Sequence, residues 1–296
     1  MHHAIQAGRV AVVTGAAAGI GKAIAVRLAA QDMILLLCDR NEQELHLAAI
    51  QLRLARPGIR IHTLAGDVSD TTFQQALYDR AVLLGDIGLL VNNAGILAGA
   101  GPWETPARWR EVMEINFWSV LHLQHLFVPR LMAQPCRSAV VNVGSKEGIT
   151  TPPGNAAYNV SKAALKVLTE QLAHELREAV QDKVSAHLLI PGYTFTPMNF
   201  PDTAAGAPKP AAPWTADQVA QRMLERMQAG DFYLFCEDNE VTPELDRRRI
   251  QWAADDLILN RPALSRWHPG YRDRYAACVN GLQPTTPDPS SSRKGA

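Results

Sequence analysis

Short, nearly continuous apolar runs recur along most of the chain. They lie at 9–14, 33–38, 59–64, 87–92, 138–143, 184–190 and 231–236, the run at 59–64 being a weaker alternating one. Such runs are typical of strands that are buried on both faces of a parallel sheet. Between them lie segments with helical spacing of apolar residues, among them 21–30, 105–132 and 158–180. Strands that alternate with helices predict an α/β protein with a doubly wound, mostly parallel sheet and right-handed crossovers.

Composition and charge exclude several classes of protein. The 29 basic and 29 acidic residues cancel, so the chain has no electrostatic footprint for nucleic acid or an anionic membrane surface. The longest apolar run, 33–38, is strand-sized and far below the roughly 18 residues that cross a bilayer. No signal peptide is recognisable at the N-terminus. The four cysteines are scattered without a CxxC pair, which indicates thiols in a reducing compartment and no metal site. We therefore expect a cytoplasmic protein.

The turn after the first strand is rich in glycine and opens a helix. Glycine lets the backbone approach a pyrophosphate, and a helix N-terminus adds N–H donors and a positive dipole end. The spacing differs from GxGxxG, and Ala23 stands where an ATP-binding P-loop needs Ser or Thr. ATP hydrolysis is therefore disfavoured, and a tight turn without a ligand is the alternative. The residues expected to border a dinucleotide here are Gly15, Ala17, Gly19, Ile20 and Gly21.

Acidic residues end the next two strands. Asp39 follows the second strand, where a carboxylate can accept both ribose hydroxyls of an adenosine. Asp67 and Val68 follow the third strand and could border the adenine. A turn residue for Asp39, and a helix cap for Asp67, are the alternatives that these positions leave open.

Tyr158 and Lys162 carry the strongest chemical signal. Residues at i and i+4 share a helix face, which brings the Lys162 ammonium and the Tyr158 hydroxyl to the same ligand. A phenol with a pKa near 10 is a poor base at neutral pH, and a nearby cation favours its ionised form. Ser145 lies just past the end of a strand, where ligands bind in open α/β sheets. Its hydroxyl could polarise a substrate carbonyl.

In this order the motifs resemble those of the short-chain dehydrogenase/reductase superfamily. The resemblance covers residues 9 to about 196. It rests on TGAAAGIG at 14–21, Asn92-Asn93-Ala94-Gly95, Asn116 within EINFW, Ser145, the Tyr158/Lys162 pair, and Pro191-Gly192-Tyr193-Thr194-Phe195-Thr196. A chance match of all six in order is negligible. Gly144 replaces the serine that commonly precedes the family's catalytic serine, a departure of small consequence.

The resemblance implies a three-layer Rossmann fold with about seven parallel strands, and hydride transfer between a nicotinamide cofactor and a secondary alcohol or carbonyl compound. Tyr158 would be the general acid/base, and Lys162 would lower the pKa of Tyr158 and hold the nicotinamide ribose. Ser145 would orient and polarise the carbonyl. Asn116 would hold a helix kink and a water that links Lys162 to solvent. The further cofactor contacts implied are Asn93, Ala94, Gly95, Pro191, Gly192, Thr194 and Thr196.

Asp39 decides our expectation for the cofactor. A carboxylate at this position pairs with the ribose hydroxyls of NAD and repels the 2′-phosphate of NADP. Ala18 offers no basic side chain for that phosphate. Arg40 acts in the other direction, because a basic residue after the strand end is one way in which the resembled family accommodates NADP. We weigh Asp39 above Arg40 and predict NAD, with NADP as the less favoured cofactor.

The C-terminal part departs from the resembled family, whose members usually end soon after the last strand. We expect one cofactor-binding domain over 1–238, including a substrate loop at 197–229 that begins with a proline-rich stretch. A helical extension over 239–282 would pack on it, starting at Thr242-Pro243. The low-complexity residues 283–296 predict disorder. Members of the resembled family often dimerise through two long helices, which correspond to 105–132 and 158–180 here. The resemblance therefore implies a homodimer or homotetramer.

The leading function is an NAD-dependent dehydrogenase of a small alcohol or ketone. An NADPH-dependent carbonyl reductase and a non-catalytic NAD-binding protein are the alternatives, and the complete set of four catalytic residues argues against the second. Lys146 and Glu147 could add a polar contact to the substrate. The apolar and aromatic residues expected near the substrate are Trp103, Tyr193, Met198, Phe200 and Trp214.

Overall fold

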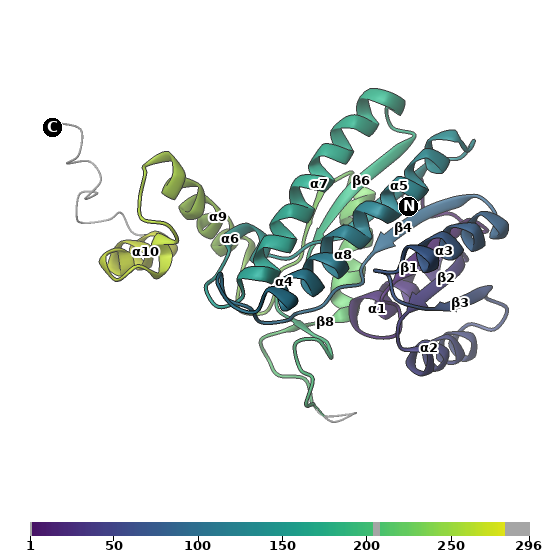
Figure 1. Ribbon diagram of the computed structural model, residues 1–296, viewed down its shortest axis with the longest axis horizontal. Coiled ribbons are helices and arrows are strands. Elements are labelled where there is room, and N and C mark those ends of the chain that lie inside the picture. Colours follow the sequence, from purple (N-terminus) through teal and green to yellow (C-terminus); the bar gives the residue numbers. More distant parts are fainter. Residues whose placement is uncertain (1, 204–207, 282–296) are drawn as a thin grey trace.

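The computed structural model describes residues 2–203 and 208–281. Its centre is a seven-stranded sheet in the order β3-β2-β1-β4-β5-β6-β9, with every neighbouring pair parallel (Figure 1). The strands are β1 (Val10–Thr14), β2 (Ile34–Asp39), β3 (Ile61–Ala65), β4 (Ile87–Asn92), β5 (Ser138–Val143), β6 (Val184–Ile190) and β9 (Tyr233–Phe235). The doubly wound α/β fold and its seven parallel strands are confirmed. The order reverses between β1 and β4, and the crevice outside the carboxyl ends of such strands is where ligands bind in open α/β sheets.

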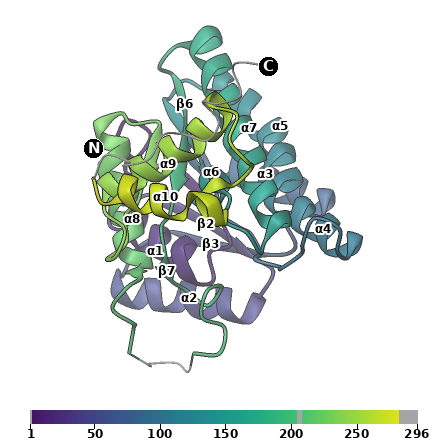
Figure 2. The same cartoon turned by 90° about the vertical axis from the view of Figure 1, so that its left-hand side faces the viewer.

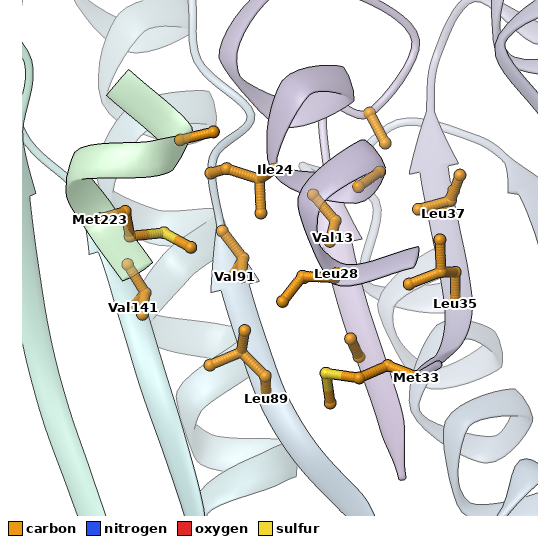
Figure 3. Packing of buried hydrophobic residues seen from close by; sticks show 14 of the residues in the cluster. Val13, Ile24, Leu28, Met33, Leu35, Leu37, Leu89, Val91, Val141 and Met223 are labelled. Carbon is orange, nitrogen blue, oxygen red and sulfur yellow. The ribbon is translucent and has the colours of Figure 1, made fainter. Parts of the chain in front are cut away.

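Helices cover both faces of the sheet. One face carries α1 (Gly19–Ala29), α2 (Glu42–Ala55) and α8 (Ala216–Ala229), and the other carries α3 (Thr71–Leu84), α5 (Ser119–Ala133) and α7 (Ala156–Val180). Val13 packs toward the first set, whereas Val12 packs toward the second. Figure 3 shows the first face, where Ile24 and Leu28 of α1 and Met223 of α8 meet strand side chains. Burial on both faces explains why the strands are apolar throughout rather than alternating.

The helix expected at 105–132 is interrupted. It consists of α4 (Pro106–Met113), a π-helical turn η1 (Glu114–Trp118) and α5. Single π turns inside α-helices are frequent at functional sites. This turn contains Asn116, so the kink that the resemblance implied is present.

Two short strands were not expected from the sequence. β7 (Thr194–Phe195), in the PGxxxT motif, pairs in parallel with β8 (Trp214–Thr215), which lies in the region expected as a substrate loop. At two residues each they leave no periodic signal. α8 begins with a capping box, in which Thr215 accepts from the Gln218 N–H and the Gln218 side chain accepts from the Thr215 N–H.

The C-terminal extension is helical and stands out from the sheet. α9 (Pro243–Ile258) begins after the N-cap Thr242, as predicted, and two 3₁₀ turns, η2 (Ser265–Trp267) and η3 (Pro269–Tyr271), lead to α10 (Arg272–Val279). α9 lies beside the one-turn helix α6 (Glu147–Thr150), and α10 packs on α9 and the two turns (Figures 1 and 2). α10 was missed, because it buries none of its residues and so has no apolar stripe.

Inside the extension, the aromatic rings pack on one another. Trp252 is buried, meets Tyr271 and Tyr275 edge-on, and donates from Nε1 to the Ser265 hydroxyl at 2.8 Å. The prediction of disorder at 283–296 lies outside the described residues. Within the part of the chain that is described, no helix is long and apolar enough to cross a membrane.

Candidate active site

The turn from β1 to α1 is built on glycines that the packing requires. Gly15 and Gly19 have φ of +65° and +54°, a region that favours glycine. A Cβ on Gly15 would lie 2.9 Å from the Ala94 Cα, and one on Gly21 would lie 2.2 Å from the Gly15 carbonyl oxygen. α1 begins at Gly19 without a side-chain cap, so its first N–H groups are available to an anion.

Beside this turn lies a cavity of about 560 Å³ at the carboxyl ends of the strands. It is lined by Gly15, Ala18, Gly19, Ile20, Asp39, Arg40, Asn93, Ala94, Gly95, Leu97, Val143, Gly144, Ser145, Lys146, Glu147, Tyr158, Lys162, Pro191, Gly192, Tyr193, Thr194, Thr196, Pro197, Met198 and Asn199. The residues expected to bind a dinucleotide and those expected to act on a substrate thus meet in one cavity. This size and lining suit a nucleotide cofactor together with a small substrate.

Asp39 is held at the end of β2 by backbone donors. One carboxylate oxygen accepts from the Ala17 N–H at 3.1 Å and the other from the Asn41 N–H at 3.0 Å. The carboxylate therefore faces the cavity in a fixed position, with lone pairs left for ribose hydroxyls. Arg40 lines the same end of the cavity.

The turn after β4 is tied to the turn after β1. The Asn93 side-chain amide donates to the carbonyls of Thr14 and Gly15 at 2.9 and 3.0 Å, and the Thr14 hydroxyl oxygen accepts from the N–H groups of Asn93 and Ala94. These bonds hold together the two turns that flank the reversal of strand order. The glycine-rich turn is therefore fixed before any ligand binds.

Asn116 is buried behind this turn rather than in the cavity. Its Oδ1 accepts from the Ile96 N–H at 2.8 Å, and its Nδ2 donates to the Ile96 carbonyl at 3.0 Å and the Ser161 hydroxyl at 3.1 Å. It therefore links the loop after β4 to α7, the helix that carries Tyr158 and Lys162.

Tyr158, Ser145 and Lys162 form the polar centre of the cavity. Burial is the main cause that raises the pKa of Tyr158 to about 12, with a further contribution from the Glu147 charge, and the neighbouring Ser145 side chain acts against both. The Lys162 Nζ donates to the Val143 carbonyl at 2.8 Å and lies 5.6 Å from the centre of the Tyr158 ring. Burial lowers the pKa of Lys162 to about 8.

The pKa of Tyr158 is therefore raised rather than lowered, contrary to the expectation from its neighbour Lys162. Desolvation penalises the charged forms of both side chains, and it moves the two pKa values apart, that of Tyr158 upward to about 12 and that of Lys162 downward to about 8. Transfer of the phenol proton to the Lys162 amine therefore costs more free energy than the ordinary pKa values of about 10 and 10.4 imply, so burial favours the neutral phenol.

Five predicted site residues lie outside the cavity lining. They are Ala17, Gly21, Asp67, Val68 and Asn116. The Ala17 N–H is bound to Asp39, and Gly21 packs on Gly15. Asp67 accepts from the N–H and hydroxyl of Ser69, bonds that hold the pKa of its carboxyl below the usual value, and Val68 packs in the core. The helix cap that the sequence left open for Asp67 is not observed, because Asp70 is the N-cap of α3 and Asp67 holds the turn before it.

Among the substrate candidates, Tyr193 and Met198 line the cavity, whereas Trp103, Phe200 and Trp214 do not. Trp103 is 88% exposed, and Phe200 stacks on Tyr193 and Phe195. Lining residues that were not predicted include Leu97, Val143, Pro197 and Asn199, which lie within three positions of the NNAG motif, Ser145 or the PGxxxT motif. Closeness to those motifs is the signal that could have found them.

Known proteins resemble this chain over most of its length. The model of the short chain dehydrogenase family matches residues 9–205. 1-deoxy-11-beta-hydroxypentalenate dehydrogenase of Streptomyces exfoliatus is 34% identical over 77% of this chain and 82% of its own length. Cyclopentanol dehydrogenase of a Comamonas species is 31% identical over 79% of this chain and 91% of its own.

Solved structures agree. A short chain dehydrogenase/reductase from Burkholderia phymatum, in complex with NAD, superposes with a TM-score of 0.77 at 30% identity, covering 87% of this chain and 96% of that one. A short-chain dehydrogenase from Sphingobium yanoikuyae, in complex with NADPH, has a TM-score of 0.66 at 23% identity over 76% and 86% of the two chains, a likeness of fold alone.

The fold and the cavity define a nicotinamide-dependent oxidoreductase of the Rossmann type. The chain belongs to the short-chain dehydrogenase family, as its motifs predicted. It is an enzyme that interconverts alcohol and carbonyl groups.

Proposed function

We propose that this chain is an NAD-dependent dehydrogenase that oxidises a secondary alcohol to a ketone, with Tyr158 as the general base. One observation carries the proposal: Ser145 and Tyr158 lie in the same cavity as the glycine-rich turn and Asp39. The cavity thus offers a proton acceptor and a nucleotide site within reach of one substrate.

The glycine-rich turn and the free N-terminus of α1 would hold the cofactor's pyrophosphate, and Asp39 its adenosine ribose. The bound nicotinamide supplies the hydride acceptor. Ser145 would donate to or accept from the substrate oxygen and so fix it beside the Tyr158 phenol. Tyr158 would take the hydroxyl proton, and Lys162, whose burial lowers its pKa to about 8, would stabilise the phenolate that precedes this transfer.

Asp39 supports NAD as the cofactor, since its carboxylate occupies the place that a 2′-phosphate needs. The relative from Burkholderia phymatum was solved with NAD. Arg40 also lines the cavity and favours the second candidate, an NADPH-dependent carbonyl reductase. Our proposal extends to a cytoplasmic homodimer or homotetramer. The four free thiols fit a reducing compartment.

Replacement of Tyr158 tests the proposal. In Tyr158→Phe the ring keeps its packing and loses only the proton-transferring hydroxyl. We expect kcat to fall by about 10²–10⁴, the span for loss of a general acid or base, with the Kd for NADH within twofold of the parent. NADH formation from a panel of secondary alcohols measures the first, and fluorescence titration the second.

Tyr78→Phe is the matched control, because Tyr78 packs on Phe127 within the core and away from the cavity. It should leave turnover unchanged. Turnover by Tyr158→Phe that equals the control would remove Tyr158 from the mechanism.

A further inference from the structure

Lys146 and Glu147 follow Ser145 directly and both line the cavity. Neighbouring side chains of opposite charge would ordinarily neutralise each other. Here the Lys146 Nζ lies 2.5 Å from the Asp246 Oδ2 of α9 and 3.8 Å from the Asp238 Oδ2. Lys146 is thus turned away from Glu147 and toward the C-terminal part of the chain.

The two aspartates are well placed to keep it there. Asp238 accepts hydrogen bonds from the N–H groups of Tyr193, Glu240 and Val241, which fix its carboxylate. The side chains of Lys146, Asp238 and Asp246 are only 17%, 6% and 12% exposed. Water screens an ion pair weakly in such a setting, so the attraction is stronger than between surface charges.

Glu147 lies in the cavity without a partner for its carboxylate. Across residues 2–203 and 208–281, its carboxylate has neither a hydrogen bond nor an ion pair, although the residue is only partly exposed. Its backbone N–H donates to the Ser145 Oγ at 3.1 Å, which fixes it beside the catalytic serine. Burial raises the pKa of Glu147, the physical sign that this charge has lost hydration.

The other residues on this side of the cavity carry no charge. Leu97, Met198 and Pro197 are apolar, the Tyr193 phenol belongs to an exposed side chain, and the Asn199 amide donates to the Thr194 carbonyl at 2.8 Å. The Lys162 ammonium is bound to the Val143 carbonyl. A donor carried by the substrate is the group that would satisfy Glu147.

We propose that Glu147 determines substrate specificity: it accepts a hydrogen bond from a second hydroxyl or an ammonium group that lies close to the reacting carbinol. The favoured substrate class is therefore a diol or an amino alcohol, and a carboxylate in that place is repelled. A substrate analogue that lacks the donor leaves the Glu147 acceptor buried and unpaired. Because this costs free energy, the analogue is a poor substrate. The inference rests on the proposed dehydrogenase function.

Matched alcohols on two scaffolds test the inference. Cyclopentanol, trans-cyclopentane-1,2-diol, trans-2-aminocyclopentanol and trans-2-hydroxycyclopentanecarboxylate are compared by NADH formation, and 1-tetralol and trans-tetralin-1,2-diol repeat the first pair on a larger ring. On at least one scaffold, kcat/KM for the diol should exceed that for the plain alcohol by about tenfold or more, a difference of about 1.4 kcal/mol. The carboxylate should be the poorest substrate. Equal rates for the diol and the amino alcohol would mean that Glu147 acts as a hydrogen-bond acceptor. A clear preference for the amino alcohol would mean that its charge attracts the ammonium group.

Variants isolate the side chain. Glu147→Leu removes the acceptor and should bring the diol and the plain alcohol within about threefold of each other, with the carboxylate improved. Glu147→Gln keeps an acceptor oxygen and should retain part of the diol preference while losing any preference for the ammonium. Glu178→Gln, at an exposed position of α7, should change none of these ratios.

The outcomes separate the inference from the function beneath it. A parent enzyme that prefers the plain alcohols, or a Glu147→Leu variant with unchanged ratios, overturns the role of Glu147. NADH binding without turnover of any donor-bearing compound also counts against it. Failure to bind either nicotinamide cofactor in fluorescence titration would overturn the proposed function instead.

Discussion

Asp39 illustrates how much a single side chain depends on the backbone around it. An aspartate at the end of a strand has several ordinary roles, and here the N–H groups of Ala17 and Asn41 hold both of its oxygens in place. The same bonds keep the carboxylate at the edge of the cavity beside Arg40. A phosphate would have to displace or neutralise it.

Asp39→Asn removes this charge and keeps an acceptor of the same shape. The ratio of kcat/KM with NADP to kcat/KM with NAD should rise by about 10- to 100-fold, since repulsion of the 2′-phosphate is lost. Steady-state rates with each cofactor measure the ratio. Asp273→Asn on α10, which is exposed, should leave it unchanged, and a parent enzyme that uses NADP as well as NAD would contradict our assignment.

At the scale of elements, the π turn η1 links the loop after β4 to α7, the helix that carries Tyr158 and Lys162. The extra residue in the turn moves Asn116 into the interior, where its side chain holds the loop after β4 and, through Ser161, the helix α7. The loop after β4 and the helix that carries the catalytic pair are therefore positioned by one side chain. The extension is arranged differently, because its rings form a small core of their own and Asp246 links it to the cavity through Lys146.

Asn116→Ala removes three hydrogen bonds and leaves the N–H and carbonyl of Ile96 without their partner. At about 1 kcal/mol for each bond, the free energy of unfolding should fall by about 3 kcal/mol. Chemical denaturation measures this loss. In the variant that remains folded, kcat should fall more than cofactor affinity, because the glycine-rich turn keeps its own bonds to Asn93.

Asn280→Ala, at the exposed end of α10, serves as the comparison and should cost less than about 0.5 kcal/mol. A loss in Asn116→Ala no greater than in this comparison would show that η1 holds its shape without the side chain.

At the scale of the whole molecule, a cluster of histidines links the N-terminal segment to the sheet. The His2 ring packs edge-on against His187 of β6 with centres 5.3 Å apart, and His187 binds the Asp231 carbonyl. Burial, with the neighbouring histidines, lowers the pKa of His2 to about 3, and burial also lowers the pKa of His187. The folded protein therefore binds fewer protons than the unfolded chain, whose histidines titrate near 6.5.

The free energy of unfolding should consequently rise with pH between about 3 and 6.5. The contribution of the buried histidines is fully present above about pH 6.5 and is lost progressively as the pH falls toward 3. Thermal unfolding between pH 8 and pH 4.5 should show a falling Tm, and His2→Asn should reduce the dependence on pH even where it lowers Tm at pH 8. His46→Asn, at an exposed position of α2, should leave the dependence as it is. An equal slope of Tm against pH for the two variants would exclude the histidine cluster as the source of the pH dependence.

The sequence alone determined the strands, the two faces of the sheet and the order of the motifs. Burial on both faces requires continuous apolar runs, and the approach of a backbone to a pyrophosphate requires glycine, so both constraints are local and leave a pattern in the residues. The capping box of α8 and the start of α9 at Thr242 depend on neighbouring residues in the same way.

The tertiary structure decided what depends on residues far apart in the chain. Asn116 is separated from Ser161 by 45 positions, and the charge of Lys146 is taken up by Asp246 on an element that the family's motifs do not contain. The pKa of Tyr158 rises because other elements bury it, although its helical neighbour Lys162 alone predicted a fall. Desolvation and long-range pairing arise only when the elements pack. The sequence therefore predicted which residues form the site, whereas their pKa values and ion pairs depend on the fold.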